Sequence, residues 1–147
     1  MNSSQNWIVS RLAIAGACLA LTTAVPAWSH HAFGAEFDVN RPVKLLGIVT
    51  KWELINPHSW IHLDVKGEDG KAITWMIEVG SPNSLYRYGF TKDSLPPGSE
   101  IVVEGYQSKD GATRAVGAKL TFSDGRKVFL GGSAPGANPE PQNSQKK

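Results

Sequence analysis

Sulfur-containing residues are almost missing from this chain. Its 147 residues include one cysteine and two methionines, and Cys18 lies in an apolar N-terminal segment that we expect to be removed. The mature protein would then have no disulfide and no thiolate metal site. Met76 would be the one methionine left, which argues against a methionine-rich copper relay.

An excess of charge of one sign is missing as well. The chain has 15 lysines and arginines against 13 acidic residues, and losing Arg11 with the N-terminal segment lowers the formal net charge of +2 by one unit. A nucleic-acid interface needs a basic stripe, and an electrostatic membrane anchor needs a cluster of basic residues. The composition therefore argues against nucleic acid and against a polybasic membrane anchor.

The apolar run at residues 12–25 is too short for a good membrane span. It follows Arg11 and precedes Ala27-Trp28-Ser29, which places small residues at the two positions that a signal peptidase reads. We therefore predict a signal peptide over residues 1–29, with His30 as the first mature residue. Cleavage two residues earlier is the alternative. The mature protein is expected in the periplasm, with no membrane span.

Short runs of β-branched and aromatic residues, the types that favour strands, follow one another along the mature chain. One segment differs, because Ser81 can cap a helix, Pro82 fits its first turn and Gly89 fits its end. We predict a short helix over residues 81–89. The expected strands are residues 43–55, 59–65, 72–79, 100–107, 115–122 and 127–130.

Three strands, a helix and two further strands is the element order of the five-stranded OB barrel. We therefore predict an all-β domain with one short helix over residues 30–130, built as a five- to six-stranded OB-like barrel (β-β-β-α-β-β). An open β-sandwich with a helical cap is the alternative. Residues 131–147 are rich in Gly, Pro, Ser and Asn, and we predict a disordered tail there.

The strand expected at residues 59–65 has two different faces. Asn56-Pro57 breaks the preceding run, because proline lacks a backbone donor and pushes the residue before it away from helix. Side chains two apart then share a face of the strand. One face is apolar, and the other presents imidazole, indole, imidazole and carboxylate. The polar-aromatic face consists of His58, Trp60, His62 and Asp64.

The four histidines suggest a metal site. His30 and His31 begin the predicted mature chain, and His58 and His62 lie on the second strand. A free terminal amine titrates near about 8 and histidine near about 6.5, so both release protons to a metal at neutral pH. Nitrogen ligands in a plane suit Cu(II). Carboxylates could orient the rings by accepting their N–H groups; the candidates are Glu53, Asp64 and Glu78.

Each of these residues also has a structural interpretation. His58 can cap the Asn-Pro turn, and His62 can bond to a neighbour across the strands. The carboxylates of Glu53, Glu78 and Glu104 can pair with nearby basic side chains. Those partners would be Lys51, Arg87 and Arg114.

Tryptophans flank the Asn-Pro corner on both sides. Trp52 precedes it and Trp60 follows it, so that together they could form a face for a small ligand or a partner. Trp75 has the same strand parity as Ile73 and Ile77, which predicts a place for it in the core.

The chain resembles a family of small exported bacterial proteins classed as a domain of unknown function. The resemblance covers most of the mature domain, and it implies a periplasmic protein with a small barrel but no established activity. It rests on the following segments: His30-His31-Ala32-Phe33, Glu36-Phe37-Asp38, Gly47 to Glu53, Asn56-Pro57-His58, Trp75, Glu78, Gly80 to Leu85, Arg87, Gly89, Leu95, Pro97-Gly98 and Val103-Glu104-Gly105.

From these features we expect a monomeric, non-enzymatic binding or accessory module. It would bind Cu(II) through the terminal histidines together with His58 and His62, and its partner would be an envelope protein or a small ligand. The alternative is a metal-free interaction module that docks through Trp52 and Trp60. A copper-dependent oxidative enzyme is a third hypothesis. No motif for a catalytic nucleophile or a phosphate loop is present to support an enzyme.

Overall fold

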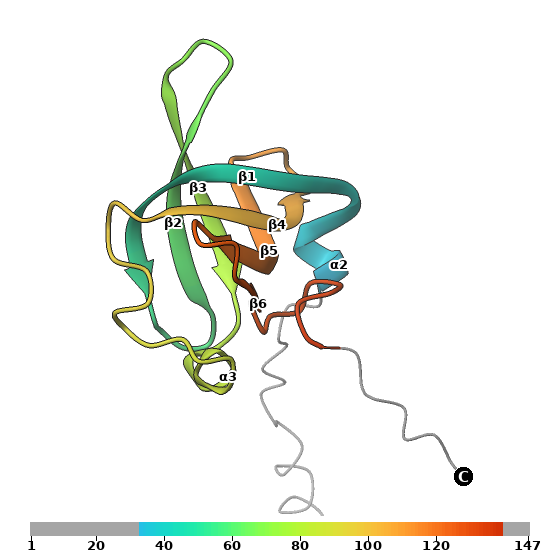
Figure 1. Cartoon of the computed structure of the whole chain (residues 1–147). Helices are drawn as coiled ribbons and strands as arrows, with labels where there is room; N and C mark the ends of the chain where they lie inside the picture. The colour runs from blue at the N-terminus through green and yellow to red at the C-terminus, as the bar shows by residue number, and fades with distance from the viewer. Residues whose placement is uncertain (1–32, 140–147) are drawn as a thin grey trace, which may run out of the picture. The chain divides into compact units, whose positions relative to one another are not determined.

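The computed structural model of the protein describes residues 33–139 (Figure 1). The predicted signal peptide, the terminal histidines His30 and His31, and residues 140–147 lie outside the described residues. Within the described part, strands alternate with turns around one helix between the third and fourth strands. The elements are α2 (Phe33–Glu36), β1 (Phe37–Glu53), β2 (Ser59–Lys66), β3 (Ala72–Val79), α3 (Pro82–Arg87), β4 (Glu100–Ser108), β5 (Arg114–Phe122) and β6 (Lys127–Phe129).

The six strands form one sheet in the order β3-β2-β1-β4-β5-β6. A short parallel pairing of Met76–Glu78 with Arg114–Val116 joins β3 to β5, so that the first five strands close into a ring. All the other strand pairs are antiparallel. The predicted mostly-β class and its strand, strand, strand, helix, strand, strand order are therefore confirmed.

The long strand β1 belongs to both halves of the ring. Its first part pairs with β4 and its second part pairs with β2, and the two pairings overlap at Gly47 and Ile48. A side chain at Gly47 would collide with the backbone oxygen of Asp64 on β2. Glycine therefore permits the close approach of β2 to β1 where the strand changes partner.

The helix α3 closes one end of the ring (Figure 1). Ser81 caps it by accepting a hydrogen bond from the Ser84 amide at 3.4 Å, and Pro82 occupies the first turn. Leu85, fully buried, joins the core inside the ring. The other buried members of this core are Leu45, Val49, Ile61, Leu63, Ile77, Val79, Phe90, Leu95, Ile101, Val103, Leu120 and Leu130.

The predicted disordered tail is wrong for residues 131–139, which pack against the outside of the ring. The Gly131 amide donates to the Ala137 carbonyl at 2.8 Å, and both Ala134 and Ala137 are buried. They lie against Val116 and Ala118 in a second apolar cluster. The cluster also contains Phe37, with Phe33 and Tyr106 packed against it, and composition alone does not reveal these contacts.

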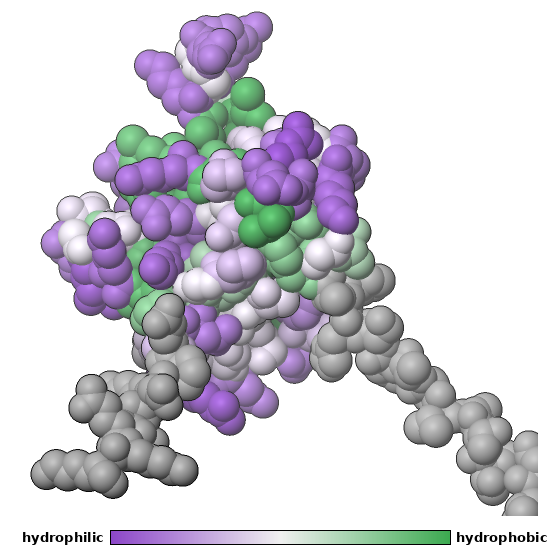
Figure 2. Space-filling model, turned by 90° about the vertical axis from the view of Figure 1, so that its right-hand side faces the viewer, coloured by the Kyte–Doolittle hydropathy of each residue, from purple (hydrophilic) through white to green (hydrophobic). Residues whose placement is uncertain are grey.

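The hairpin of β2 and β3 extends past the ring at the end opposite α3 (Figure 1). Ile73, which the alternation predicts to be buried, is 43% exposed for this reason. Strand β3, which contains Ile73, pairs with β5 only from Met76 onward. Figure 2 shows hydrophobic atoms directly below the hydrophilic tip of this hairpin. Trp75, nearer the ring, packs against the core as predicted.

Strand β1 begins at Phe37, six residues before the predicted start at Val43, because it follows directly from the short helix α2.

Among the described residues, no helix has the length and apolar character needed to cross a membrane.

Candidate functional site

The outward side of β1, β2 and β3 carries a group of histidines and carboxylates around Trp60. In the strand register, Trp60 lies opposite Glu53 on β1 and opposite Glu78 on β3. His58 and His62 lie two residues before and two residues after it on the chain. The residues between them, Ser59 and Ile61, are fully buried, so the alternation predicted for this strand is confirmed. We call this group the Trp60 face; it consists of Glu53, His58, Trp60, His62 and Glu78.

The corner before β2 holds His58 at the edge of this face. The Asn56-Pro57 bond in the corner is cis. Ser59 is anchored directly after the corner, because its amide donates to the Gly80 carbonyl at 3.1 Å and its hydroxyl donates to the Ile55 carbonyl at 3.5 Å. His58 is therefore held close to the end of β3.

His58 pairs with Glu78 across the two strands. The distance from His58 Nδ1 to Glu78 Oε1 is 2.5 Å, and the two side chains are 27% and 11% exposed. Burial raises the pKa of the Glu78 carboxyl above its ordinary value of 4.5. The nearby His58 and Arg114 act against this increase, whereas the negative charge of Glu36 adds to it.

His62 forms a matching pair with Glu53 on the other side of Trp60. The distance from His62 Nε2 to Glu53 Oε2 is 2.7 Å, and Lys51 Nζ lies 2.6 Å from the other oxygen of Glu53. Hydrogen bonds from Lys51, which has the larger effect, and from His62 lower the pKa of the Glu53 carboxyl below 4.5. Glu53 and Glu78, which we expected to orient histidine rings, thus each contact one histidine.

Asp64 does not have the role predicted for it. It shares the outward side with His62, but its carboxylate accepts a hydrogen bond from the Thr74 hydroxyl at 2.6 Å. Thr74 lies directly opposite Asp64 on β3. The nearer partner across the strands therefore takes the carboxylate, and the described contacts of Asp64 include no histidine.

Trp52 and Trp60 do not form one face, contrary to the prediction. Glu53 lies opposite Trp60, so its neighbour Trp52 points to the other side of the sheet, opposite the buried Ile61. Trp52 packs against the core, and its indole N–H donates to the Thr91 carbonyl at 3.1 Å. An irregularity in the strand between Val49 and Lys51 changes the alternation before this point, and sequence parity does not reveal it.

The two described histidines contact different glutamates, Glu78 for His58 and Glu53 for His62, on either side of Trp60. Within residues 33–139, no three His, Cys, Asp or Glu side chains come together as a metal site. The other two histidines of the sequence, His30 and His31, lie outside the described residues.

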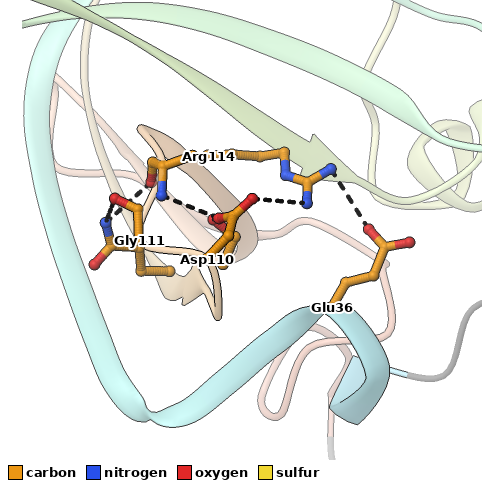
Figure 3. Close-up of polar contacts among 7 residues, drawn as sticks. Glu36, Asp110, Gly111 and Arg114 are labelled. Carbon is orange, nitrogen blue, oxygen red and sulfur yellow. Dashed lines mark hydrogen bonds and ion pairs between the residues drawn. The ribbon is translucent and has the colours of Figure 1, made fainter.

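Sequence reasoning named Arg114 as a possible partner of the strand glutamates but missed its contact with Glu36. Arg114, at the start of β5, lies 3.6 Å from Glu36 of α2 and 3.9 Å from Asp110 (Figure 3). It thus links α2, which we call the N-terminal arm, to the ring. Hydrogen bonds from the Ser108 hydroxyl, which has the larger effect, and from the Ala112 amide lower the pKa of Asp110. The charges of Glu36 and Arg114 both act on Glu78. Glu36 is one of two acidic residues in the Glu36-Phe37-Asp38 segment, and nothing in the sequence identifies Arg114 as its partner.

The comparisons with known proteins agree with the resemblance noted in the sequence. The model described as a family of unknown function, DUF6152, matches residues 18–118. This range contains α2 and all the residues of the Trp60 face. No curated protein matches the chain. No solved structure matches it.

Proposed function

The chain belongs to the family of unknown function DUF6152, and we propose that it is an exported, non-enzymatic binding module that coordinates Cu(II) on the Trp60 face. His58 supplies one imidazole ligand, and the mature N-terminus with His30 or His31 supplies the others. The observation that carries the proposal is the contact between His58 and the buried carboxyl of Glu78.

This contact selects the nitrogen that a metal would use. A carboxylate only accepts hydrogen bonds, so the proton of the neutral His58 ring lies on Nδ1 and the lone pair lies on Nε2. Nε2 is the ring nitrogen farther from the backbone. A histidine that gives one N–H to a carboxylate is fixed in orientation and becomes a more basic ligand, as is usual for metal-binding histidines.

The electrostatic surroundings of the two histidine pairs favour His58 over His62 as the copper ligand. Near Glu78, Glu36 adds a second negative charge, and the charge of Arg114 partly offsets it. Near Glu53, the ammonium of Lys51 lies 2.6 Å from the carboxylate and would oppose a second cation. His62 also uses Nε2 for its carboxylate, so only the nitrogen beside the backbone is left to it.

The attachment of the N-terminal arm supports the participation of the terminal histidines. The helix α2 begins at Phe33, two residues after His31 in the sequence. Arg114 links Glu36 at the end of α2 to the ring, and Glu36 is near enough to Glu78 to change its pKa. The arm therefore starts on the side of the ring where Glu78 and His58 lie.

The experiment is isothermal titration of Cu(II) into protein that has been exported and processed so that His30 is its first residue. We expect His58→Gln to weaken binding at least about tenfold, which corresponds to about 1.4 kcal/mol. His62→Gln is the matched control, because it removes an imidazole from the same strand, and it should change the affinity little.

A protein with one additional residue before His30 tests the terminal ligands. It blocks the free amine next to His30 but leaves His58 and Glu78 in place, so we expect weaker binding than in the processed form. Equal and weak binding by both forms would overturn the copper proposal and favour a metal-free interaction module.

A further inference from the structure

A second candidate binding site lies on the outside of the ring, away from the Trp60 face. It is a groove of about 580 Å³ between residues Pro135 and Gly136 of the C-terminal segment and the outward sides of β1, β4 and β5. None of its lining residues belongs to the Trp60 face. Its volume is within the range of about 300–1,000 Å³ that is typical of sites for small organic molecules.

The groove has rigid, flat apolar surfaces. The ring of Tyr106 is held edge-to-face by Phe33 of the N-terminal arm, with ring centroids 5.4 Å apart. Pro42 lies directly opposite Tyr106 on β1, and Pro135 lines the groove from the C-terminal segment. An aromatic ring and two pyrrolidine rings offer apolar contact with little loss of conformational entropy, since they are already fixed. These surfaces suit a ligand with a ring.

The polar groups of the groove have spare capacity for an anion. Lys44, Glu104 and Lys119 lie side by side on three neighbouring strands. Lys44 Nζ is 3.7 Å from Glu104, whereas Lys119 Nζ has no carboxylate partner among residues 33–139 and lies 5.7 Å from the centre of the Phe129 ring. Within the same residues, the Tyr106 hydroxyl has no hydrogen-bond partner. The groove therefore has one cation more than it has carboxylates, and an unused hydroxyl donor.

We propose that this groove binds a small organic carboxylate that carries a ring. The ring of the ligand packs on Tyr106 and the prolines, and its carboxylate accepts from Lys119 and from the Tyr106 hydroxyl. Charge-assisted hydrogen bonds to a carboxylate are about twice as strong as neutral ones, so the acid is preferred over its neutral amide. A long polyanion is not expected, because one uncompensated cation gives little counterion release.

Nuclear magnetic resonance titration of the ¹⁵N-labelled full chain tests the proposal. Benzoate and glucuronate are the probes for an aromatic acid and a sugar acid, with benzamide and glucose as their neutral counterparts. We expect saturable shifts for amides of β4, β5 and residues 135–136 with at least one of the acids. The affinity for the neutral counterpart, obtained from the same shifts, should be at least about tenfold lower. Which of the two acids binds more tightly distinguishes the two ligand sources.

Three variants separate the groove from general attraction of anions to lysines. Lys119→Gln removes the uncompensated cation, and Tyr106→Phe removes the hydroxyl but keeps the ring. Lys127→Gln on β6 is the matched control, because Lys127 is exposed and does not line the groove. We expect Lys119→Gln to weaken binding about tenfold and Tyr106→Phe to weaken it severalfold, with no change for Lys127→Gln. Absence of saturable shifts with both acids, or equal effects of Lys119→Gln and Lys127→Gln, would overturn the proposal.

Discussion

The two histidine–glutamate pairs beside Trp60 have the same composition and similar contact distances, yet they differ in electrostatics. In each pair the histidine reaches a glutamate opposite Trp60, at 2.5 Å for His58 and Glu78 and at 2.7 Å for His62 and Glu53. The pKa of Glu78 is raised and that of Glu53 is lowered. The contact with histidine is common to both, so the difference comes from the surroundings.

Those surroundings follow from the topology of the sheet. Glu78 lies on β3 opposite Val116 of β5, at the pairing that closes the ring, and its residue is 8% exposed. Glu53 is the last residue of β1, where the chain leaves the sheet, and it has Lys51 on the same side. Ring closure thus desolvates one glutamate and leaves the other accessible to water and to a lysine. Glu78 therefore holds its proton more readily than an ordinary glutamate, whereas Lys51 and His62 favour the charged form of Glu53.

The largest effect should come from removing each carboxylate. Glu78→Ala leaves a half-buried imidazole without its acceptor and creates a space on the ring-closing strand, so we expect a loss of about 1–3 kcal/mol in the free energy of unfolding. Glu53→Ala removes an accessible partner of Lys51 and His62 and should cost much less. Urea denaturation followed by tryptophan fluorescence measures both. Equal losses would show that burial does not distinguish the pairs.

The pH dependence of stability should have opposite signs for the two glutamates. The lowered pKa of Glu53 gives stability that is present above its unfolded value of 4.5 and is lost as the pH falls through the folded value. The raised pKa of Glu78 gives stability that is present below 4.5 and is lost as the pH rises through the folded value.

Urea denaturation of the wild type, Glu53→Gln and Glu78→Gln without metal, at pH values below and above 4.5, measures these contributions. The difference between wild type and Glu53→Gln should grow in favour of the wild type as the pH rises. The difference between wild type and Glu78→Gln should change in favour of the variant. If both differences changed in the same direction, the assigned pKa directions would be wrong for one of the glutamates.

A smaller effect is expected from Arg114→Gln, which alters only one side of the comparison. Arg114 lowers the pKa of Glu78 from a distance, so the variant should raise that pKa further, and Glu53 should be unaffected. Carboxyl ¹³C chemical shifts followed through a pH titration measure both groups in one sample. Movement of the Glu53 pKa by the same amount would indicate a general structural change in place of a local charge effect.

Local sequence signals predicted the parts of this structure that depend on neighbouring residues. Ser81 and Pro82 identified the start of α3, and the alternation after Asn56-Pro57 identified which side chains of β2 face outward. Strand β3 was predicted with the bounds that it has, Ala72–Val79. Each of these signals acts over fewer than about ten residues, within the range that periodicity and capping describe.

The features that the sequence did not predict depend on contacts between distant segments. Trp52 faces the core because of an irregularity in β1, and Ala134 and Ala137 are buried because they pack with Val116 and Ala118 of β5. The link between Glu36 and Arg114 joins residues that are far apart along the chain. Glu53 and Glu78 each contact a histidine, but their opposite pKa shifts depend on the hydrogen bond from Lys51 to Glu53 and on the burial of Glu78.

The most direct test of the account follows the histidine ring signals while Cu(II) is added in substoichiometric amounts to the processed protein. A bound paramagnetic ion broadens the signals of its own ligands first. The account predicts that the ring signals of His58 disappear with those of the terminal histidines, while the His62 ring remains visible until more Cu(II) is present. Loss of the His62 signals first, or equal broadening of all four histidines, would contradict it.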